Sequence, residues 1–169
     1  MRALGGDRAG EMRITRFLRN ARVSTGEMVA HAAAATAERC RGLHVLAVQD
    51  TTTLRDDGRR RSLALHATLA VEAEGGAVLG VLGAELLRRE GGRKRSRGAR
   101  PLADKESARW LRGAEAADAL AGGTLRVTVV ADREGDLYEA FARRPAGVEL
   151  LVRATHDRAL AAGGRLFAR

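Results

Sequence analysis

The sequence predicts an α/β fold: a mixed sheet in which a three-strand antiparallel meander is extended by two parallel strands and flanked by helices. Three observations support this prediction. Apolar runs of strand length recur along the chain, the early runs are joined by short turn segments, and the later runs are separated by stretches with helical spacing of apolar residues. With 169 residues, of which 45% are hydrophobic, the chain is about one domain with a sizeable core.

The first element with clear boundaries is a helix that begins near Thr25. Residues 24–27 read Ser-Thr-Gly-Glu, which is the form of a capping box, and Val23 and Met28 are placed as a hydrophobic staple. The helix is expected to run through the alanine-rich stretch to about Arg39. Its alanine face suits close packing against a sheet or another helix, so we interpret it as a scaffold element.

Three strands are expected next, at residues 43–52, 63–71 and 78–87. The segment 55–61 turns the chain back after the first strand, and Glu-Gly-Gly at 74–76 forms the turn before the third strand. Consecutive strands with such short connections form an antiparallel meander. A basic, glycine-containing segment at 91–101 follows and is interpreted as a solvated loop that is also available to bind an anionic partner.

A helix is expected after the basic segment, capped by Asp104 and ended by the glycines at 122–123. Its apolar positions follow helical spacing and are Trp110, Leu111, Ala114, Ala117 and Ala121. The helix carries the chain from the meander to a fourth strand at residues 127–131.

A short helix and a fifth strand complete the predicted domain. Asp136 is expected to cap the helix, with Leu137 and Phe141 on its buried face, and the strand covers 148–154. A helical crossover after a meander returns the chain parallel to the first strand, so the fourth strand is expected beside the first. This order is that of a ribonuclease-H-like core.

Aspartates end two of the predicted strands. Asp50 closes the apolar run at 43–49, and Asp132 closes the run at 127–131. If these strands are parallel neighbours, their backbones lie roughly 5 Å apart and both carboxylates meet at one edge of the sheet. Unpaired carboxylates at the rim of a core are costly, and a divalent cation is the usual remedy. The pair therefore predicts a metal site.

The charge of the chain indicates a polyanionic partner. Lysine and arginine exceed aspartate and glutamate by 30 to 21, which gives a net charge of +9, and the pI is about 11.2. Only Lys94 and Lys105 are lysines. A GC-rich coding sequence would explain why arginines outnumber lysines, but it does not explain why basic residues outnumber acidic ones.

Several classes of protein are disfavoured by the sequence. Cys40 is the only cysteine, so a disulfide framework and a cysteine zinc site are not expected. His31, His44, His66 and His156 form no recognisable metal spacing, and His66 is interpreted as a core residue or a neighbour of the site. No apolar stretch fits a signal peptide or a membrane span, which predicts a cytoplasmic, nucleoid-associated protein without membrane contact.

Several segments resemble, in the same order, the blocks of the insertion-sequence DDE transposases of group four, the Tn-five type. The segment 16–24 is similar to the block that precedes the first catalytic strand in that family. The blocks that follow are Leu46-Ala47-Val48-Gln49-Asp50-Thr51-Thr52-Thr53-Leu54, Asp104-Lys105-Glu106-Ser107-Ala108-Arg109-Trp110, Val130-Ala131-Asp132-Arg133-Glu134-Gly135-Asp136 and Leu151-Val152-Arg153-Ala154-Thr155-His156. Each block alone is a weak signal, and their common order over residues 13–160 is a strong one.

The resemblance implies a ribonuclease-H-like fold and cut-and-paste chemistry on transposon ends. Asp50 and Asp132 would be the first two catalytic acids and would hold Mg²⁺ or Mn²⁺ for in-line attack on a phosphodiester. Arg153 would match a family arginine that contacts DNA phosphate near the cleavage site. Thr51 and Thr52 would orient the first acid by hydrogen bonding, or would only cap the backbone at the end of the strand.

The implied partner is double-stranded DNA at transposon ends, with a homodimer possible in a full-length family member. Further phosphate contacts are expected from the two arginine-rich segments, namely Arg59, Arg60, Arg61, Arg93, Lys94, Arg95 and Arg97. By this interpretation residues 1–41 form an N-terminal arm and the alanine-rich helix, 42–160 form a partial catalytic core, and 161–169 form a truncated tail.

The sequence departs from the family pattern in three ways. The third family acid is a Glu in a Tyr-x-x-Arg-x-x-x-Glu motif, and Tyr138 has neither partner at the required offsets. The segment that reads the transposon-end sequence and the C-terminal dimerising helices have no counterpart. The expectation is therefore a truncated transposase fragment. Glu134, Asp136 and Glu106 are weaker candidates for a substitute third ligand.

Two alternatives remain beside the transposase fragment. One is a catalytically inactive DNA-binding or inhibitory protein derived from a transposase, which keeps the basic surface without the chemistry. The other is a small metal-dependent nuclease that is complete in itself. The missing third acid argues against the nuclease, because phosphoryl transfer needs accurate placement of its ions.

Overall fold

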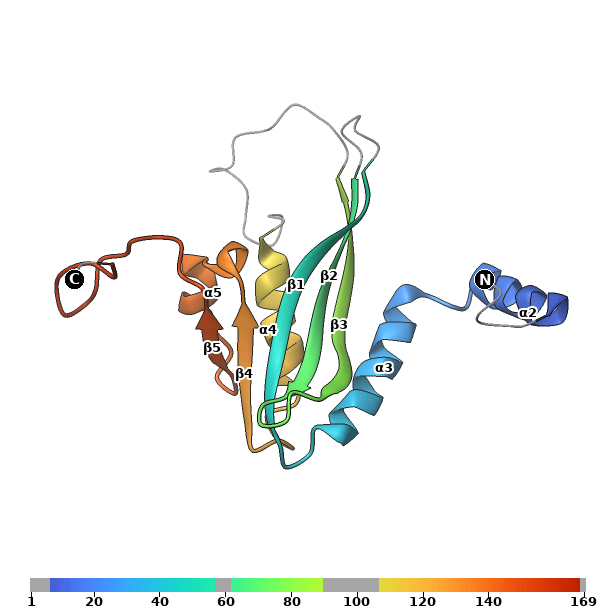
Figure 1. Cartoon of the computed structure of the whole chain (residues 1–169), viewed down its shortest axis with the longest axis horizontal. Helices are drawn as coiled ribbons and strands as arrows, with labels where there is room; N and C mark the ends of the chain where they lie inside the picture. Colours follow the sequence, from blue (N-terminus) through green and yellow to red (C-terminus); the bar gives the residue numbers. More distant parts are fainter. Residues whose placement is uncertain (1–6, 57–61, 90–106, 168–169) are drawn as a thin grey trace.

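The computed structural model describes residues 7–56, 62–89 and 107–167 and contains a single mixed sheet (Figure 1). The elements in chain order are α2 (Arg8–Arg19), α3 (Thr25–Arg39), β1 (His44–Asp56), β2 (Ser62–Glu72), β3 (Val78–Arg89), α4 (Ala108–Asp118), β4 (Arg126–Ala131), a 3-10 helix (Arg133–Gly135), α5 (Tyr138–Ala142) and β5 (Glu149–Val152). The predicted order of strands and helices from β1 to β5 is confirmed.

The five strands lie in the order β3-β2-β1-β4-β5. The β1, β2 and β3 strands pair antiparallel, as expected for a meander, whereas β4 pairs parallel to β1 and β5 pairs parallel to β4. The α/β class and the combination of three antiparallel with two parallel strands are therefore confirmed. The crossover through α4 places β4 directly beside β1, which joins the two aspartate-bearing segments.

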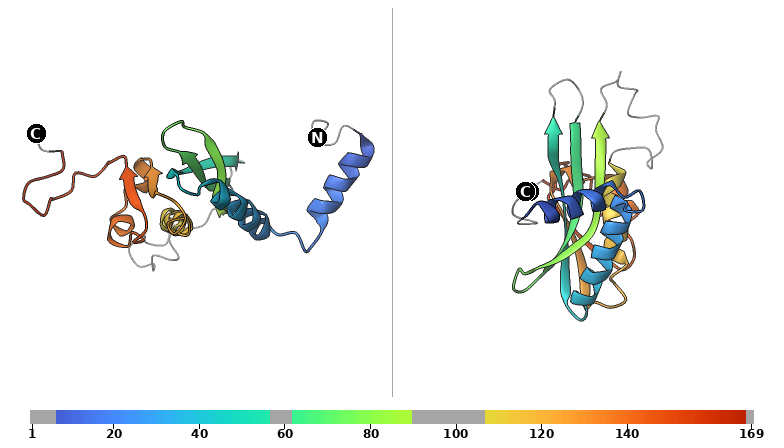
Figure 2. Two further views of the ribbon diagram at one scale, coloured as in Figure 1. Left: turned by 90° about the horizontal axis from the view of Figure 1, so that it is seen from below. Right: turned by 90° about the vertical axis from the view of Figure 1, so that its right-hand side faces the viewer.

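One face of the sheet carries the core, and α3 and α4 pack on that face (Figure 2). On β1 the buried side chains are those of Val45, Ala47 and Gln49, which alternate with more exposed neighbours. The core joins these strand residues to Cys40 at the end of α3 and to alanines of α4. Burial raises the pKa of the Cys40 thiol, consistent with an uncharged core side chain.

The opposite face of the sheet is open in the described part of the chain. Leu46 and Val48 of β1, Leu65 of β2 and Val130 of β4 are only half-buried there, because no described helix packs over them (Figure 2). Asp50 and Asp132, which follow the half-buried residues Val48 and Val130 by two positions, are exposed. None of the described helices is long and apolar enough to cross a membrane.

The predicted capping box of α3 is confirmed, and the structure contains a helix before it, α2, that was not predicted. Ser24 accepts a hydrogen bond from the backbone N–H of Glu27, whose carboxylate accepts one from the Ser24 N–H. The α2 helix precedes it and is capped by Asp7, which accepts from the Gly10 N–H at 2.7 Å. The sequence prediction treats this region only as an arm, although Ile14, Phe17 and Leu18 follow helical spacing.

Three predicted element boundaries were wrong. β1 continues to Asp56 instead of ending near residue 52. α4 covers Ala108–Asp118, so it ends before Ala121 and before the glycines at 122–123 that were expected to end it. Its N-cap position is Ser107, and Asp104, the expected cap, lies outside the described residues. β5 covers only Glu149–Val152.

The α5 helix also differs from expectation. It begins at Tyr138 after Leu137, without a side-chain cap, and none of its residues is buried. Phe141 is exposed, and the Arg158 guanidinium lies 5.3 Å from the centroid of its ring. Asp136 is therefore not the cap of this helix.

Close packing of α4 on the sheet depends on Gly113. A methyl group on this residue would lie 2.5 Å from Gln49 Oε1 and 2.8 Å from Thr68 Oγ1, in the buried layer between helix and strands. We expect Gly113→Ala to lower the free energy of unfolding measured in urea. Overpacking of this kind costs about 1–3 kcal/mol, and the gain in helix propensity of roughly 1 kcal/mol offsets only part of it.

The matched control for this substitution is Gly122→Ala. A methyl group on Gly122 would meet no atom within 4 Å, so its substitution should leave the unfolding midpoint nearly unchanged. Equal stability of Gly113→Ala and the unsubstituted protein would contradict the close approach of α4 to β1 and β2.

Candidate metal and nucleic-acid site

Asp50 lies on β1, whereas Asp132 and Arg153 directly follow the last residues of β4 and β5. The β1–β4 ladder pairs Val48 with Val130, and the β4–β5 ladder pairs Ala131 with Val152. Continuing these parallel registers places Asp50 opposite Asp132 and Asp132 opposite Arg153. Adjacent strands lie about 4.7–4.9 Å apart, so the three residues form a row at one end of the parallel strands.

All three residues of this row belong to the open face of the sheet. Asp50 alternates with the buried Gln49, and Asp132 follows the buried Ala131. Arg153 alternates in the same way with Val152, and Asp50, Asp132 and Arg153 are exposed. The row therefore faces away from α4 and is accessible from the open side.

Asp50 does not end its strand, contrary to the sequence prediction. β1 continues to Asp56 because residues after Asp50 remain paired with β2, for example Thr52 with Leu65. The parallel neighbour β4 does end, at Ala131. Asp50 therefore marks the point at which β1 loses its parallel partner, and not the point at which it leaves the sheet.

Asp132 turns the chain into the 3-10 helix. Its Oδ1 atom accepts a hydrogen bond from the Glu134 N–H at 2.8 Å, which makes Asp132 the cap of this helix. No hydrogen bond or ion pair joins the carboxylate of Asp50, or the other carboxylate oxygen of Asp132, to a described residue. Carboxylate oxygens are the hard ligands that Mg²⁺ and Mn²⁺ prefer, so the chemistry of these donor atoms fits either ion.

Thr51 lies on the opposite face from Asp50 and does not orient it directly. Its hydroxyl lies 2.9 Å from His66 Nδ1, and His66 Nε2 lies 3.2 Å from Gln49 Oε1. Burial lowers the pKa of His66 to about 4, helped by the charge of Arg109. The ring is therefore neutral at pH 7, donating to Gln49 and accepting from Thr51. Thr52 is exposed, and its hydroxyl forms no hydrogen bond with another described residue.

Arg109 connects this buried network to the segment of Asp132. Its side chain is only 7% exposed, Nε donates to Thr51 Oγ1 at 3.1 Å, and Nη2 donates to Glu134 Oε2 at 2.8 Å. The guanidinium also lies 5.4 Å from the centroid of the Trp110 ring. Trp110 in turn makes an edge contact with His66, with the ring centroids 4.8 Å apart.

Asp136 anchors the chain that follows β5. Its carboxylate accepts from the N–H groups of Thr155 and His156 at 2.6 and 2.8 Å and pairs with Arg158. Burial by itself would raise the pKa of Asp136, but these hydrogen bonds and the Arg158 charge hold it below its ordinary value. Because Arg153 lies just before the anchored segment, Asp136 helps to fix the position of Arg153.

Two of the three weaker candidates for a third metal ligand are described by the structure, and both form ion pairs with arginines. Glu134 pairs with Arg109, and Asp136 is buried against Arg158. Glu106 lies outside the described residues. The described residues contain no group of three or more His, Cys, Asp or Glu side chains placed to hold one ion.

Of the predicted DNA-contacting residues, the structure describes only Arg153. The others lie outside the described residues, namely Arg59, Arg60, Arg61, Arg93, Lys94, Arg95 and Arg97. The sequence did not predict that Gln49 and Arg109 belong to the hydrogen-bond network next to the aspartates. Arg109 belongs to one of the family-like blocks, but a single arginine in a helix does not indicate what its side chain contacts.

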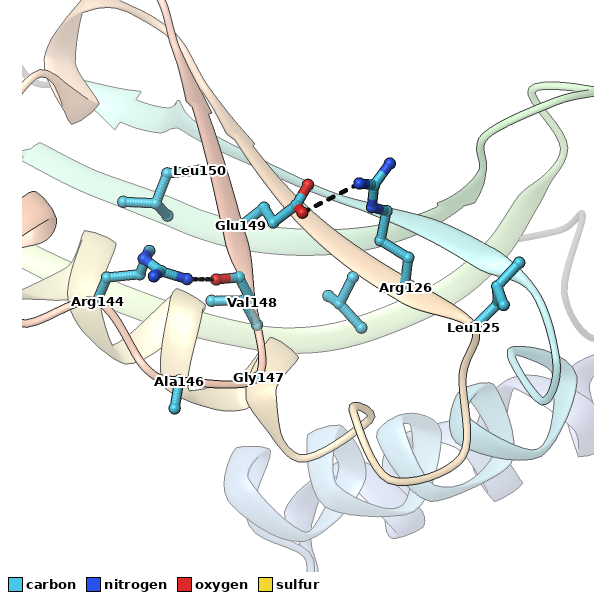
Figure 3. Close-up of a pocket in the computed structure, with 9 residues that line it drawn as sticks. Leu125, Arg126, Arg144, Ala146, Gly147, Val148, Glu149 and Leu150 are labelled. Atoms are coloured by element: carbon cyan, nitrogen blue, oxygen red, sulfur yellow. Dashed lines mark hydrogen bonds and ion pairs between the residues drawn. The ribbon is translucent and has the colours of Figure 1, made fainter.

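A separate depression lies at the other end of β4 and β5 (Figure 3). Arg126 and Arg144 line it, but Arg126 pairs with Glu149 at 3.2 Å and Arg144 donates to the Val148 carbonyl. Its two guanidinium groups are thus already engaged, and the depression does not adjoin the aspartates.

Comparison with known proteins gives no assignment: no protein-family model matches the chain, and no curated protein matches it.

Proposed function

We propose that this protein carries out metal-dependent phosphodiester chemistry on DNA, as a DDE transposase with a ribonuclease-H-like core. The observation that carries this proposal is the parallel β1–β4 register, which, when continued past Val48 and Val130, brings Asp50 opposite Asp132 where β4 ends. The mixed sheet with strand order β3-β2-β1-β4-β5 is compatible with such a core. The ordered blocks similar to the Tn-five type agree with it.

The accessibility and charge of the site support a nucleic-acid substrate. Asp50, Asp132 and Arg153 share the open face, so a duplex is able to approach them without displacing a described helix. The net charge of +9 favours association with a phosphate backbone through counterion release. We infer that Arg153 contacts a phosphate beside the acids.

Each residue has a defined role in the proposed mechanism. The carboxylates of Asp50 and Asp132 would hold Mg²⁺ or Mn²⁺, and the bound ion would supply Lewis-acid activation of water and charge stabilisation on the phosphate oxygens. Arg153 orients the phosphodiester from the neighbouring strand. The backbone N–H of Glu134 donates a hydrogen bond to Oδ1 of Asp132 and so holds that carboxylate in one orientation. The second carboxylate oxygen of Asp132 is the one that would bind the ion. Full activity requires a third acidic ligand in addition to these aspartates.

A second candidate function is DNA binding without catalysis. It is favoured by the excess of basic over acidic residues, 30 to 21, which supports binding to a phosphate backbone without a complete metal site. Incubation of supercoiled plasmid with the protein and Mn²⁺ separates the candidates, because only the transposase proposal expects nicking. Binding to DNA with no nicking above a protein-free control would favour the non-catalytic protein, and transposition by the isolated chain is not expected.

Binding to duplex DNA should be weak, largely independent of sequence and strongly reduced by salt. Each neutralised phosphate contributes roughly −0.9 to the slope of log affinity against log salt concentration. We expect Arg153→Gln to reduce the magnitude of this slope by about 1, as measured by fluorescence anisotropy at several salt concentrations.

The control is Arg41→Gln, because Arg41 lies beyond α3 and pairs with Glu38. This substitution should change the salt slope less than Arg153→Gln does. Binding that is insensitive to salt, or an equal effect of both substitutions, would count against a phosphate contact by Arg153.

A further inference from the structure

We propose that Arg109 is the positioning residue that sets the spacing of Asp50 and Asp132, an inference that rests on the metal site of the proposed function. A cross-link is needed because the β1–β4 ladder runs only from His44/Arg126 to Val48/Val130. Beyond this pair, β1 continues in the sheet while the other segment turns into the 3-10 helix. The backbone ladder between these strands therefore stops before the two acids.

Arg109 supplies the missing connection through side chains. Its Nε atom donates to Thr51, the residue after Asp50, and its Nη2 atom donates to Glu134. The N–H of Glu134 in turn donates to Oδ1 of Asp132. A continuous chain of hydrogen bonds thus links the segment of one acid to the side chain of the other.

The geometry of this link suits an arginine. The planar guanidinium donates in two fixed directions, which a lysine ammonium does not reproduce. Its own position is held by the ring of Trp110 and by burial between α4 and the sheet. The hydroxyl of Thr51 is also held, because it donates to the neutral His66.

Arg109 is placed to act on the aspartates through their neighbours. It forms an ion pair with Glu134, and its Nε atom reaches Thr51 on the face of β1 opposite to Asp50. The carboxylates themselves lie on the open face, where they are accessible to a cation. Outer residues that orient metal ligands typically change metal affinity by about 10–100-fold when they are replaced.

The test is a titration of the full chain with Tb³⁺, read as luminescence sensitised by tryptophan. Trp110 is the only tryptophan, and its ring packs against Gly135 beside Asp132. The unsubstituted protein should bind Tb³⁺, Mn²⁺ should compete, and Asp132→Asn should lose binding. Arg109→Gln should then weaken binding by about 10–100-fold.

The sign of this effect separates positioning from simple electrostatics. Removal of a positive charge near a cation site should by itself strengthen cation binding, whereas loss of the link weakens it. Arg112→Gln is the matched control, since Arg112 lies on the same helix and pairs with Glu85. It should not weaken Tb³⁺ binding.

Further variants keep the test decisive if Arg109→Gln does not fold. Thr51→Val removes one contact of Arg109 and should weaken Tb³⁺ binding, whereas Thr51→Ser keeps the hydroxyl and should restore it. Glu134→Ala should also weaken binding. Glu134→Gln keeps an acceptor for Arg109 and should stay close to the unsubstituted protein, whereas a loss equal to that of alanine would identify Glu134 as a ligand and overturn the positioning role.

The outcomes distinguish this inference from the proposed function. If the unsubstituted protein binds Tb³⁺ and the Arg109, Thr51 and Glu134 variants bind it equally well, the positioning role is wrong and the metal site stands. If the unsubstituted protein binds no Tb³⁺ that depends on Asp50 and Asp132, both the metal site and the positioning role are overturned.

Discussion

Replacement of Asp50 or Asp132 by asparagine is expected to abolish Mn²⁺-dependent nicking of supercoiled DNA. Each substitution keeps the shape of the side chain and removes the charge that holds the cation. Misplacement of a reacting group by about 1 Å costs on the order of a hundredfold in rate, and loss of a ligand should cost at least as much. The nicking of the unsubstituted chain is itself expected to be slow, because these two acids supply only part of a two-metal site.

The assay should compare nicking rates with Mn²⁺, with Mg²⁺ and with a chelator. Glu115→Gln is a suitable control, because Glu115 is exposed on α4 and its substitution changes the net charge by the same amount. This control should nick at the rate of the unsubstituted protein. Nicking that survives Asp50→Asn or Asp50→Ala would show that the cleavage comes from another site or from a contaminant.

Binding of DNA gives an independent measurement on the same variants. Asp50→Asn and Asp132→Asn remove negative charge from a surface that is proposed to approach phosphate, so they should bind duplex DNA at least as tightly as the unsubstituted protein. Loss of nicking together with retained binding would separate a catalytic role from a failure to fold.

Replacement of Asp136 by alanine is expected to cause a large loss of stability. The Asp136 side chain is fully buried and holds Arg158 and the N–H groups of Thr155 and His156. Its removal leaves those donors without their acceptor, and a hydrogen bond to a charged group contributes about 1.5–3 kcal/mol. The measurement is the free energy of unfolding in urea at pH 7.

The pH dependence of stability provides a second test of Asp136. Its folded pKa lies below the ordinary value of 3.8. The stabilisation it provides is therefore fully present above that ordinary value and is lost as the pH falls through the folded pKa. Asp136→Asn should remove this component, so the variant should lose less stability on acidification than the unsubstituted protein.

Asp157→Asn is the matched control for Asp136. Asp157 also accepts from an arginine and a backbone N–H, those of Arg165 and Phe167, but its side chain is 37% exposed. Solvent screens such a pair, so its loss should move the urea midpoint much less. Equal shifts of the urea midpoint for Asp136→Asn and Asp157→Asn would contradict the conclusion that burial of Asp136 makes its contacts more stabilising than those of Asp157.

Local sequence patterns predicted several elements of the fold correctly. The capping box located the start of α3, because the contacts that form it lie within four consecutive residues. The apolar runs located β2, β3 and β4, and burial alternates along β2 and β4. The order of these elements, with a helical crossover, predicted that β4 would lie parallel to β1.

Nonlocal pairing explains where the local patterns failed. The first strand was predicted to end at Thr52, yet β1 continues to Asp56 because β2 also pairs with Thr53, Arg55 and Asp56. Asp136 had the position of a helix cap, but its partners come from beyond β5. The pattern of apolar and polar residues around a position does not indicate a hydrogen-bond partner that lies far along the chain.

The sequence by itself determined the α/β class, the meander and the pairing of the two aspartate-bearing segments, because alternation and crossover handedness are local or topological properties. Only the tertiary structure decided what surrounds Asp50 and Asp132. In the structure the Thr51 hydroxyl forms hydrogen bonds with His66 and Arg109, and the two aspartates lie on the open face. Those assignments depend on register and on helix packing, which set side-chain contacts across the sheet and α4.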